Sequence, residues 1–349
     1  MTKTLIAHIG IGKAGSTAIQ KHFFQHQAIL SHAKLQYWGL NLEFTKAKTT
    51  YPWQTPGGIG ILQKMKAPQA IEELKCVLLE AIQATPDGHK AIWSNESIYE
   101  QPDVYCQVLE EIRDESRVDL LIIGYARNHS QYTVSAYKQW GIKHKTNSGR
   151  ILDFREWVNL RKDFLSYGKK LAQWELRFPN SFKLFNYDSA GDIVTHFLNT
   201  FDSSSDLLPS KTDRSVNASP QTSELALFAL YNNQFHEPVT PKGMQDILRR
   251  FPQVRQQQQQ QLASLSSLFP AASDIAHAMQ LLSEDIAIVD EMLMRRGQPP
   301  LPGNISKQEE GLTELEVTNC VLSALLNMII LQDQRIADLE TKIRPPNTS

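Results

Sequence analysis

The chain has 349 residues, 41% of them hydrophobic, and a formal net charge of −1. This length can bury a full core, and the balanced charge excludes a global field that would attract nucleic acid or an anionic membrane. No stretch approaches the roughly 20 consecutive apolar residues that a membrane-spanning helix needs, so we expect neither a membrane span nor a nucleic-acid partner.

The cysteines and the N-terminus indicate the compartment. Cys76, Cys106 and Cys320 are odd in number and far apart, which favours reduced thiols over a disulfide framework. No pair has the spacing of metal ligands, so no metal site is expected. The N-terminal stretch MTKTLIAHIG has one lysine and a short apolar run, which predicts a strand rather than a signal peptide. We therefore expect a cytoplasmic protein.

Apolar runs and helical periodicities alternate through the first half of the chain. Short, nearly continuous apolar runs are typical of strands buried on both faces of a parallel sheet. Such runs occur at Thr4–Ile9, Lys90–Ser94, Leu120–Tyr125 and Phe182–Tyr187. Helical patterns lie between them, at Ser16–Leu30, Ala67–Ala84, Val104–Glu115 and Asp153–Arg177, the last predicted as two helices. This alternation predicts a three-layer α/β/α fold with a central parallel sheet.

Beyond about residue 220 the strand signals stop and the pattern becomes helical. Ser219 is a predicted N-cap with Pro220 at the first helical position, and the glutamine run 256–261 favours a solvated helix face over disorder. The stretch GQPPLPGNISKQEEG has the composition of a linker. We predict an α/β domain at residues 1–235, then a helical extension, a linker and an amphipathic or coiled-coil helix, at 236–297, 298–311 and 312–344.

The last of these segments carries a seven-residue apolar repeat. Its main row is made of Leu315, Leu322, Ile329, Ile336 and Ile343. The companion core row contains Leu325 and Leu339, and Thr318 and Gln332 interrupt it. Such a seam predicts a homodimer built at least partly through this helix, since a long apolar stripe is uncommon on a soluble monomer. The alternative is a terminal helix that packs on its own domain.

One stretch, HIGIGKAGSTAIQ from His8 to Gln20, has the profile of a strand, a tight loop and a helix start. Glycines 10, 12 and 15 allow tight turns, Lys13 adds a mobile positive charge, and Ser16 and Thr17 add hydroxyls at the first helical turn. Because a helix N-terminus favours anions, the loop predicts a phosphate or sulfate cradle.

The spacing of this loop departs from the nucleotide-triphosphate P-loop. That pattern needs a glycine at position 7 and a hydroxyl residue directly after the lysine, where this chain has Ala7 and Ala14. No clear acidic magnesium ligand ends a later strand. A P-loop kinase that uses ATP and magnesium is therefore the second hypothesis, and a non-catalytic nucleotide-binding scaffold is the third.

The stretch resembles the 5′-phosphosulfate loop of sulfotransferases that use 3′-phosphoadenosine-5′-phosphosulfate (PAPS). Bacterial members typically read H-[IV]-G-x-x-K-[TS]-G-[TS]-T-x-[LI]-Q, from which Ala14 departs. A second motif follows at IIGYARNHSQYTVSAY, where Arg127 ends an apolar run and Ser135 comes eight residues later. The family recognises the 3′-phosphate of the nucleotide with this Arg-x7-Ser arrangement, in which a guanidinium fork and a hydroxyl grip one phosphate.

The resemblance covers most of residues 1–235 and implies a P-loop NTPase-like sulfotransferase fold, with PAPS as donor and 3′-phosphoadenosine-5′-phosphate (PAP) as product. A weaker similarity, in DRSVNASPQTSELALFALYN, brings Arg214 near the nucleotide. The glycine-rich strap of many eukaryotic members is missing, which leaves the cover of the adenosine open. The implied nucleotide-binding set is Gly12, Lys13, Ala14, Gly15, Ser16, Thr17, Arg127, Ser135 and Arg214.

The implied reaction transfers a sulfuryl group to a hydroxyl of a glycan or small-molecule acceptor. Lys13 would stabilise the leaving phosphate, and the acceptor needs a base. Glu96, two residues past a strand end, is the first candidate, although a helix-capping carboxylate explains it equally well. His22, on the loop helix, is the second.

The acceptor itself is not specified by the sequence. Trp38, Tyr51 and Trp53 lie in a long region of weak secondary structure. They form either a stacking surface for a sugar or ring system or the packing of a lid.

Overall fold

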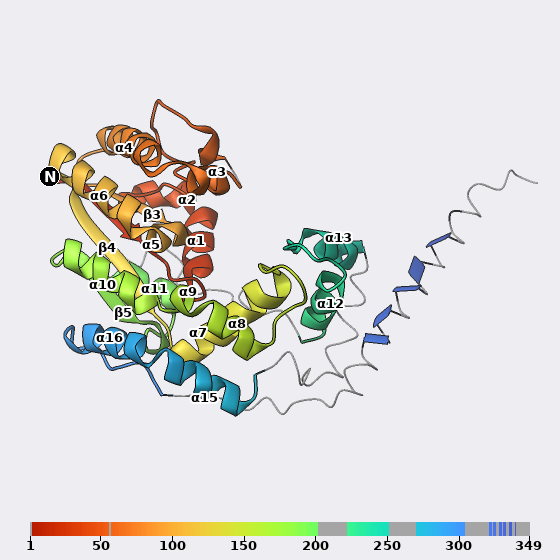
Figure 1. Ribbon diagram of the computed structural model, residues 1–349. Coiled ribbons are helices and arrows are strands. Elements are labelled where there is room, and N and C mark those ends of the chain that lie inside the picture. Colours follow the sequence, from red (N-terminus) through yellow and green to blue (C-terminus); the bar gives the residue numbers. More distant parts are fainter. Residues whose placement is uncertain are drawn as a thin grey trace, which may run out of the picture. The chain divides into compact units, whose positions relative to one another are not determined.

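A computed structural model of the chain is shown in Figure 1. It describes residues 2–55, 57–201, 222–250 and 270–303, and eleven further positions (321, 322, 324, 325, 328, 329, 331, 332, 335, 336 and 339). Several predictions fall outside these residues. They concern Arg214, the glutamine run, the linker beyond residue 303, Cys320, and the seam positions Leu315, Thr318 and Ile343.

The centre of the described chain is a five-stranded parallel sheet. Its strands are β1 (Thr4–His8), β2 (Leu35–Tyr37), β3 (Lys90–Ser94), β4 (Asp119–Ala126) and β5 (Phe182–Asn186), in the order β2-β3-β1-β4-β5. Four of them confirm the strands predicted from apolar runs. No apolar run predicts β2, because its three residues are too few to give a pattern.

The register of the sheet explains which side chains each face carries. His8 pairs with Ser94 and Ala7 pairs with Trp93, so His8 and Trp93 point to opposite faces. On one face the His8 ring packs on Phe197, with 5.3 Å between ring centroids. On the other face Trp93 packs on Tyr105 at 5.8 Å. Both faces are therefore buried under helices, as the apolar runs predicted.

Helices cover both faces of the sheet (Figure 1). Helices α1 (Ser16–Gln25) and α11 (Ile193–Asn199) contact each other on the His8 face, and α6 (Pro102–Ser116) contacts α4 (Ala67–Ala84) and α10 (Tyr167–Arg177) on the other. This is an α/β architecture compatible with three layers, in which helices make the connections that parallel strands require. The remaining helices of this part are α2 (Gln27–Leu30), α3 (Ile59–Lys64), α5 (Glu96–Glu100), α9 (Lys162–Leu165) and α16 (Ser283–Met294).

The chain divides into two compact units that interleave along the sequence. The first contains Met1–His129, Asp163–Asn217 and Leu282–Gly303, and the second contains Ser130–Lys162, Ala218–Leu281 and Asn304–Ser349. This division differs from the boundaries predicted at residues 235, 297 and 311, because α16 returns to pack on α10 and β5.

A glycine on α10 permits this close return of α16. A Cβ at Gly168 would lie 2.7 Å from Val289 Cγ2. The contact joins residues more than a hundred positions apart, so a local sequence pattern carries no signal for it.

The described part of the second unit is mainly helical. It contains α7 (His129–Ala136), the π-helical turn η3 (Tyr137–Lys143), α8 (Phe154–Leu160), α12 (Thr222–Asn232), α13 (Lys242–Arg250) and α15 (Ala272–Leu281). The absence of strands after residue 220, within the described ranges, agrees with the predicted helical region. None of the helices among the described residues is long and apolar enough to cross a membrane.

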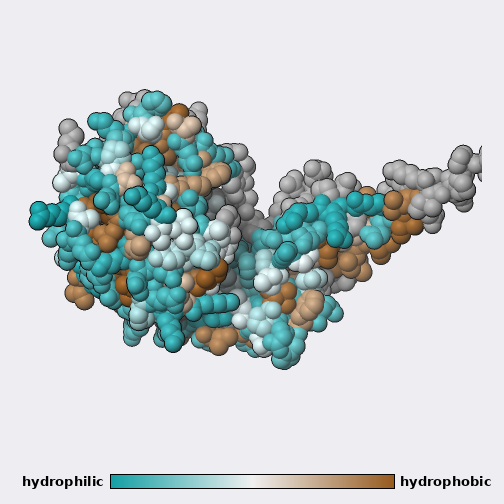
Figure 2. Space-filling view, turned by 90° about the horizontal axis from the view of Figure 1, so that it is seen from above, coloured by the Kyte–Doolittle hydropathy of each residue, from teal (hydrophilic) through white to brown (hydrophobic). Residues whose placement is uncertain are grey.

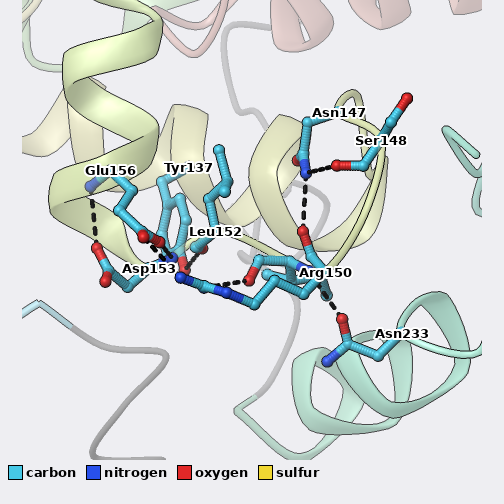
Figure 3. A network of polar contacts seen from close by, with 9 residues as sticks. Tyr137, Asn147, Ser148, Arg150, Leu152, Asp153, Glu156 and Asn233 are labelled. Carbon is cyan, nitrogen blue, oxygen red and sulfur yellow. Dashed lines mark hydrogen bonds and ion pairs between the residues drawn. The ribbon is translucent and has the colours of Figure 1, made fainter. Parts of the chain in front are cut away.

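Polar contacts fix the loop that precedes α8 (Figure 3). Asp153 and Glu156 form a capping box, in which the Glu156 amide donates to Asp153 Oδ1 at 2.9 Å and the Asp153 amide donates to Glu156 Oε2 at 3.0 Å. Arg150 Nη2 donates to Glu156 Oε1 at 2.6 Å, and the Ile151 amide donates to Asn233 Oδ1 at 2.8 Å. The loop is therefore joined to α8 and to the end of α12.

A buried lysine joins the same loop to α12. Lys145 is 1% exposed, and its Nζ donates to the Gly149 carbonyl at 2.6 Å and to the Phe235 carbonyl. Further carbonyl oxygens, those of Asn232 and His236, lie at 3.4 Å. Burial lowers the pKa of Lys145, and these carbonyls offset part of its desolvation.

Candidate functional site

The loop between β1 and α1 forms a tight turn with Lys13 near its tip. The Ala14 amide donates to the Ile11 carbonyl at 3.1 Å, which closes a turn over Gly12 and Lys13. Lys13 has a φ of 70°, a left-handed conformation that costs energy for a residue with a side chain. A strained lysine at such a turn is typical of a functional site.

Two glycines in this loop are required by space and backbone conformation. A Cβ at Gly10 would lie 2.1 Å from Ser16 Oγ. Gly15 precedes α1 with a φ of 86°, and a Cβ there would lie 2.8 Å from Ile193 Cγ1. The loop consequently folds back onto the start of α1.

The start of α1 presents an anion-binding surface. Ser16 is 2% exposed, and its Oγ lacks a hydrogen-bond partner of good geometry among the described residues. Thr17 is exposed and Ala14 is buried. The first amides of a helix carry partial positive charge, and the orphaned hydroxyl and Lys13 add to it. Phosphate or sulfate oxygens fit such a donor set.

Arg127 joins the end of β4 to this loop. Its Nη1 donates to the Lys13 carbonyl at 2.5 Å, and the guanidinium carbon lies 5.6 Å from the centroid of the Tyr187 ring. Tyr187 follows β5 directly. Lys13 and Arg127, both singled out by sequence motifs, are therefore brought together at one edge of the sheet, while no motif indicates the aromatic support from Tyr187.

A buried network holds the backbone of Arg127. The Tyr167 hydroxyl donates to the Arg127 carbonyl and lies 3.2 Å from His129 Nδ1. His129 Nε2 lies 3.0 Å from Asp285 Oδ2, and the amides of residues 168 and 169 donate to the same carboxylate at 2.9 and 3.0 Å. These residues come from distant parts of the chain, so no local signal in the sequence identifies them.

A proline-rich segment crosses the ends of β4 and β5. Asn186 Nδ2 donates to the carbonyls of Pro299 and Pro300 at 3.1 and 3.2 Å, and Asn128 Nδ2 donates to the carbonyl of Pro302. These residues belong to the predicted linker, but the ends of two strands fix them. Composition predicts a linker because prolines lack the amide donors that regular structure needs. Here the proline carbonyls accept hydrogen bonds from asparagine side chains at the strand ends.

Glu96 is the first residue of α5, beyond the end of β3. The cap of that helix is Asn95, whose Oδ1 accepts from the Ser97 amide at 2.7 Å. Burial raises the pKa of Glu96, nearby Glu100 adds to the rise, and Lys13 opposes it. The Ser16 hydroxyl also lies near enough to lower this pKa, although it makes no hydrogen bond of good geometry.

The Glu96 carboxyl and the Lys13 ammonium therefore lie within electrostatic range of each other. Because Asn95 caps α5, the Glu96 side chain is not needed for helix capping. A carboxyl with a raised pKa beside a cation is typical of a catalytic base.

His22 is buried on the second turn of α1. Its ring centroid lies 4.5 Å from that of His26, and Nε2 has no partner among the described residues. Burial, and to a smaller extent His26, lower the pKa of His22 to about 4, and Asp192 opposes the shift. His22 lies six positions after Ser16, about 9 Å along the helix axis. The rings that contact it are those of Phe23 and His26.

The last two residues of the predicted nucleotide site are Ser135 and Arg214. Ser135 is half-buried on α7 and belongs to the second unit, and Arg214 lies outside the described residues.

The aromatic residues expected to stack on an acceptor are mostly in the core. Trp38 and Trp53 are 1% and 0% exposed, and Trp53 Nε1 donates to Glu73 Oε2 at 2.8 Å. Trp38 and Trp53 therefore offer no stacking surface, and packing, the alternative, describes these two residues better. Tyr51 is half-buried and lines a cavity of the same segment.

The same segment instead forms a cavity of about 460 Å³. Asn95 Nδ2 donates to the Leu40 carbonyl at 2.6 Å, which ties the segment to the residue before Glu96. A carboxylate, hydroxyls and an amide suit a polar ligand with several hydroxyl groups. The lining residues are Leu42, Glu43, Thr45, Ala47, Thr50, Tyr51, Pro52, Gln54 and Thr55.

The residues gathered here follow β1, β3 and β4, whose carboxyl ends are neighbours in the sheet. The connection that leaves β1 runs to one side and those that leave β3 and β4 run to the other, and open α/β sheets bind ligands at such a divergence. Among the described residues no group of three or more His, Cys, Asp or Glu could hold a metal ion. A comparison of the chain with family models, curated proteins and solved structures finds no match in any of the three.

Proposed function

We propose that the chain is a sulfotransferase that transfers a sulfuryl group from PAPS to a hydroxyl of a glycan or small-molecule acceptor. The observation that carries the proposal is the meeting of Lys13 and Arg127 at the loop before α1, 2.5 Å apart from guanidinium nitrogen to carbonyl oxygen. Two cations at a helix N-terminus suit a nucleotide with phosphate groups at two positions. The resemblance of both motifs to the PAPS-dependent family supplies the identity of the nucleotide.

The buried, unpaired Ser16 Oγ and the left-handed turn at Lys13 support binding of the 5′-phosphosulfate at this loop. Arg127 and Ser135 would bind the 3′-phosphate, and Arg214 would approach the nucleotide. When bound, PAPS supplies an activated sulfuryl group. The loop residues assigned to it are Gly12, Lys13, Ala14, Gly15, Ser16 and Thr17.

Glu96 would take the proton of the acceptor hydroxyl as its oxygen bonds to sulfur. Lys13 would offset the negative charge that develops on the 5′-phosphate oxygen as the bond from sulfur to that oxygen breaks. The raised pKa of Glu96 brings a carboxyl closer to the range in which a base is effective near neutral pH. His22, neutral because its pKa is about 4, is the second candidate for the base.

The cavity beside Leu42 and Gln54 is the region that we assign to the acceptor. Its hydroxyl, amide and carboxylate groups favour an acceptor with several hydroxyls over a flat apolar ring. The cytoplasmic location and the sulfotransferase variant of the α/β/α fold belong to the same proposal.

Isothermal titration calorimetry tests the proposal against its main alternative, a P-loop kinase. We expect PAP to bind the full chain without added metal and to bind more tightly than ATP with magnesium. ATP binding that depends on magnesium, together with weaker binding of PAP, would support the kinase and overturn the sulfotransferase.

A further inference from the structure

The C-terminal seam is exposed on the described chain. The described residues between 321 and 339 are helical, and four of the seam positions are 49–65% exposed: Leu322, Ile329, Ile336 and Leu339. The fifth, Leu325, is 44% exposed. Hydrophobic residues gather along this segment in Figure 2. A stripe of this length on one helix face is typical of an interaction surface.

A different face of the same helix is packed. Ala324 is 1% exposed, and Val321, Met328 and Leu331 are half-buried. The most buried of these side chains do not belong to the seam, so the helix is partly packed on its own unit while most of the seam surface stays exposed. The seam residues Leu325, Ile329 and Ile336 also line a groove of about 680 Å³, together with Ile247 of α13.

We propose that a second copy of this chain covers the seam, as a parallel and in-register coiled coil. The seven-residue spacing of Leu322, Ile329 and Ile336 places them at one core position, and Leu325, Gln332 and Leu339 occupy the other. A self-complementary surface of this kind is what a two-fold dimer requires.

The polar residue Gln332 favours a parallel over an antiparallel orientation of the two helices. In a parallel, in-register pair Gln332 faces Gln332 of the second copy, so the two amides can hydrogen-bond to each other. In an antiparallel pair with the same overlap, Gln332 would face Ile329, and its amide would be buried without a partner. Gln332, which interrupts the apolar row, therefore favours the in-register alignment of the two helices.

Charges flanking the seam agree with this orientation. Arg335 takes the position before Ile336, and Glu340 takes the position after Leu339. These are the flanking positions that pair between parallel strands, five residues apart, and the pair forms twice in the dimer. In the antiparallel alignment Arg335 would lie opposite Met328 instead.

Light scattering on the full chain tests the dimer. We expect twice the 39.6 kDa mass of one chain. The double substitution Ile329→Asp and Ile336→Asp places four charges in the seam and raises the dissociation constant at least about 100-fold. Gln334→Asp, at the position of the seven-residue repeat farthest from the two core rows, is the matched control and leaves the dimer intact. A monomer for the unaltered chain at about 100 μM, or a dimer that survives the double substitution, overturns the proposal.

Cysteine cross-linking tests the orientation, in a background with Cys76→Ser and Cys320→Ser. Ile336→Cys then forms a disulfide-linked dimer on mild oxidation, because only a parallel, in-register pair brings two copies of residue 336 together. Gln334→Cys, the matched control, stays uncross-linked. If instead chains carrying Leu325→Cys cross-link only to chains carrying Ile336→Cys, the pair is antiparallel and the proposed register is wrong. Circular dichroism of each variant verifies that it is folded.

Discussion

Arg127 Nη1 donates a hydrogen bond to the Lys13 carbonyl at 2.5 Å, although 114 positions separate the two residues in the chain. The bond ties the end of β4 to the loop after β1. It also sets the direction of the guanidinium, which lies over the Tyr187 ring. A cation held on two sides is organised before any ligand arrives, so its substitution should affect affinity more than folding.

Arg127→Ala is expected to weaken PAP binding by about 2–3 kcal/mol, because it removes a charge-assisted contact to phosphate. Adenosine 5′-phosphate, which lacks the 3′-phosphate, should lose much less affinity. Calorimetry with both nucleotides measures the difference, and Arg117→Ala, at the exposed end of α6, is the control. Equal losses for the two nucleotides would show that Arg127 does not recognise the 3′-phosphate.

Lys13→Gly and Lys13→Ala both remove the ammonium group, but only glycine tolerates the left-handed backbone at this position, so the pair separates the effect of the charge from that of backbone strain. Both should lose most of the turnover. Because Lys13 has a φ of 70°, the glycine variant should be about 1 kcal/mol more stable than the alanine variant. Urea denaturation measures the stabilities, and Lys64→Ala serves as an exposed control. Equal stability of the two variants would contradict the strain.

Glu96→Gln should abolish turnover and raise stability at neutral pH. Burial raises the pKa of the folded carboxyl above its unfolded value, so ionisation at pH 7 opposes folding and an uncharged amide removes that cost. Thermal unfolding against pH checks the sign: the gain should grow as pH rises through the folded pKa and vanish in acid. Glu72→Gln, on the exposed side of α4, is the control. A variant that retains turnover would exclude Glu96 as the base.

His22 should make the protein sensitive to acid between pH 6.5 and about 4. The pKa of the folded imidazole is lowered to about 4, whereas the unfolded group titrates near its ordinary value, so unfolding takes up a proton in this window. His22→Gln should therefore flatten the pH dependence of the unfolding free energy by up to about 1.4 kcal/mol per pH unit. His32→Gln, at an exposed position, should leave the slope unchanged. Identical slopes for His22→Gln and the unaltered chain would refute the shift.

Lys145→Met should destabilise the second unit by about 2–4 kcal/mol, because buried carbonyls such as those of Gly149 and Phe235 lose their donor. Lys242→Met, on the exposed start of α13, should cost little. Hydrogen exchange of the amides in α8 and α12 would report the loss locally. Unchanged protection there would mean that the lysine contributes no net stability.

Local pattern was sufficient for much of the fold. The runs that became β1, β3, β4 and β5 are almost wholly apolar, and a strand buried on both faces needs that composition. The predicted helix at Ala67–Ala84 was found with the same bounds. The predicted helix at Ser16–Leu30 ends instead at Gln25 and resumes at Gln27, and Asp153–Arg177 forms three helices, α8, α9 and α10. Helix ends depend on tertiary contacts that periodicity does not contain.

Pattern identified the residues of the candidate site that lie within a motif, and it missed those that support them. Lys13 and Arg127 stand in recognisable local contexts, and both come to the same loop. Tyr167 contacts Arg127 across 40 positions, and Asp285 contacts Gly168 across 117, separations that no local spacing encodes. The sequence left Trp38 and Trp53 open between a stacking surface and packing, because aromatic residues in an irregular segment look alike whether they are buried or exposed.

Release of PAP from PAPS by the full chain, measured across a panel of polyhydroxylated acceptors, tests the sulfotransferase most directly. We expect release that depends on the acceptor, is retained in Lys64→Ala and falls at least about 100-fold, or roughly 2.7 kcal/mol, in Lys13→Ala. Release from Lys13→Ala within about threefold of the unaltered chain, roughly 0.7 kcal/mol, would contradict it. So would tight binding of PAP without transfer to any acceptor, which is the behaviour of a nucleotide-binding scaffold.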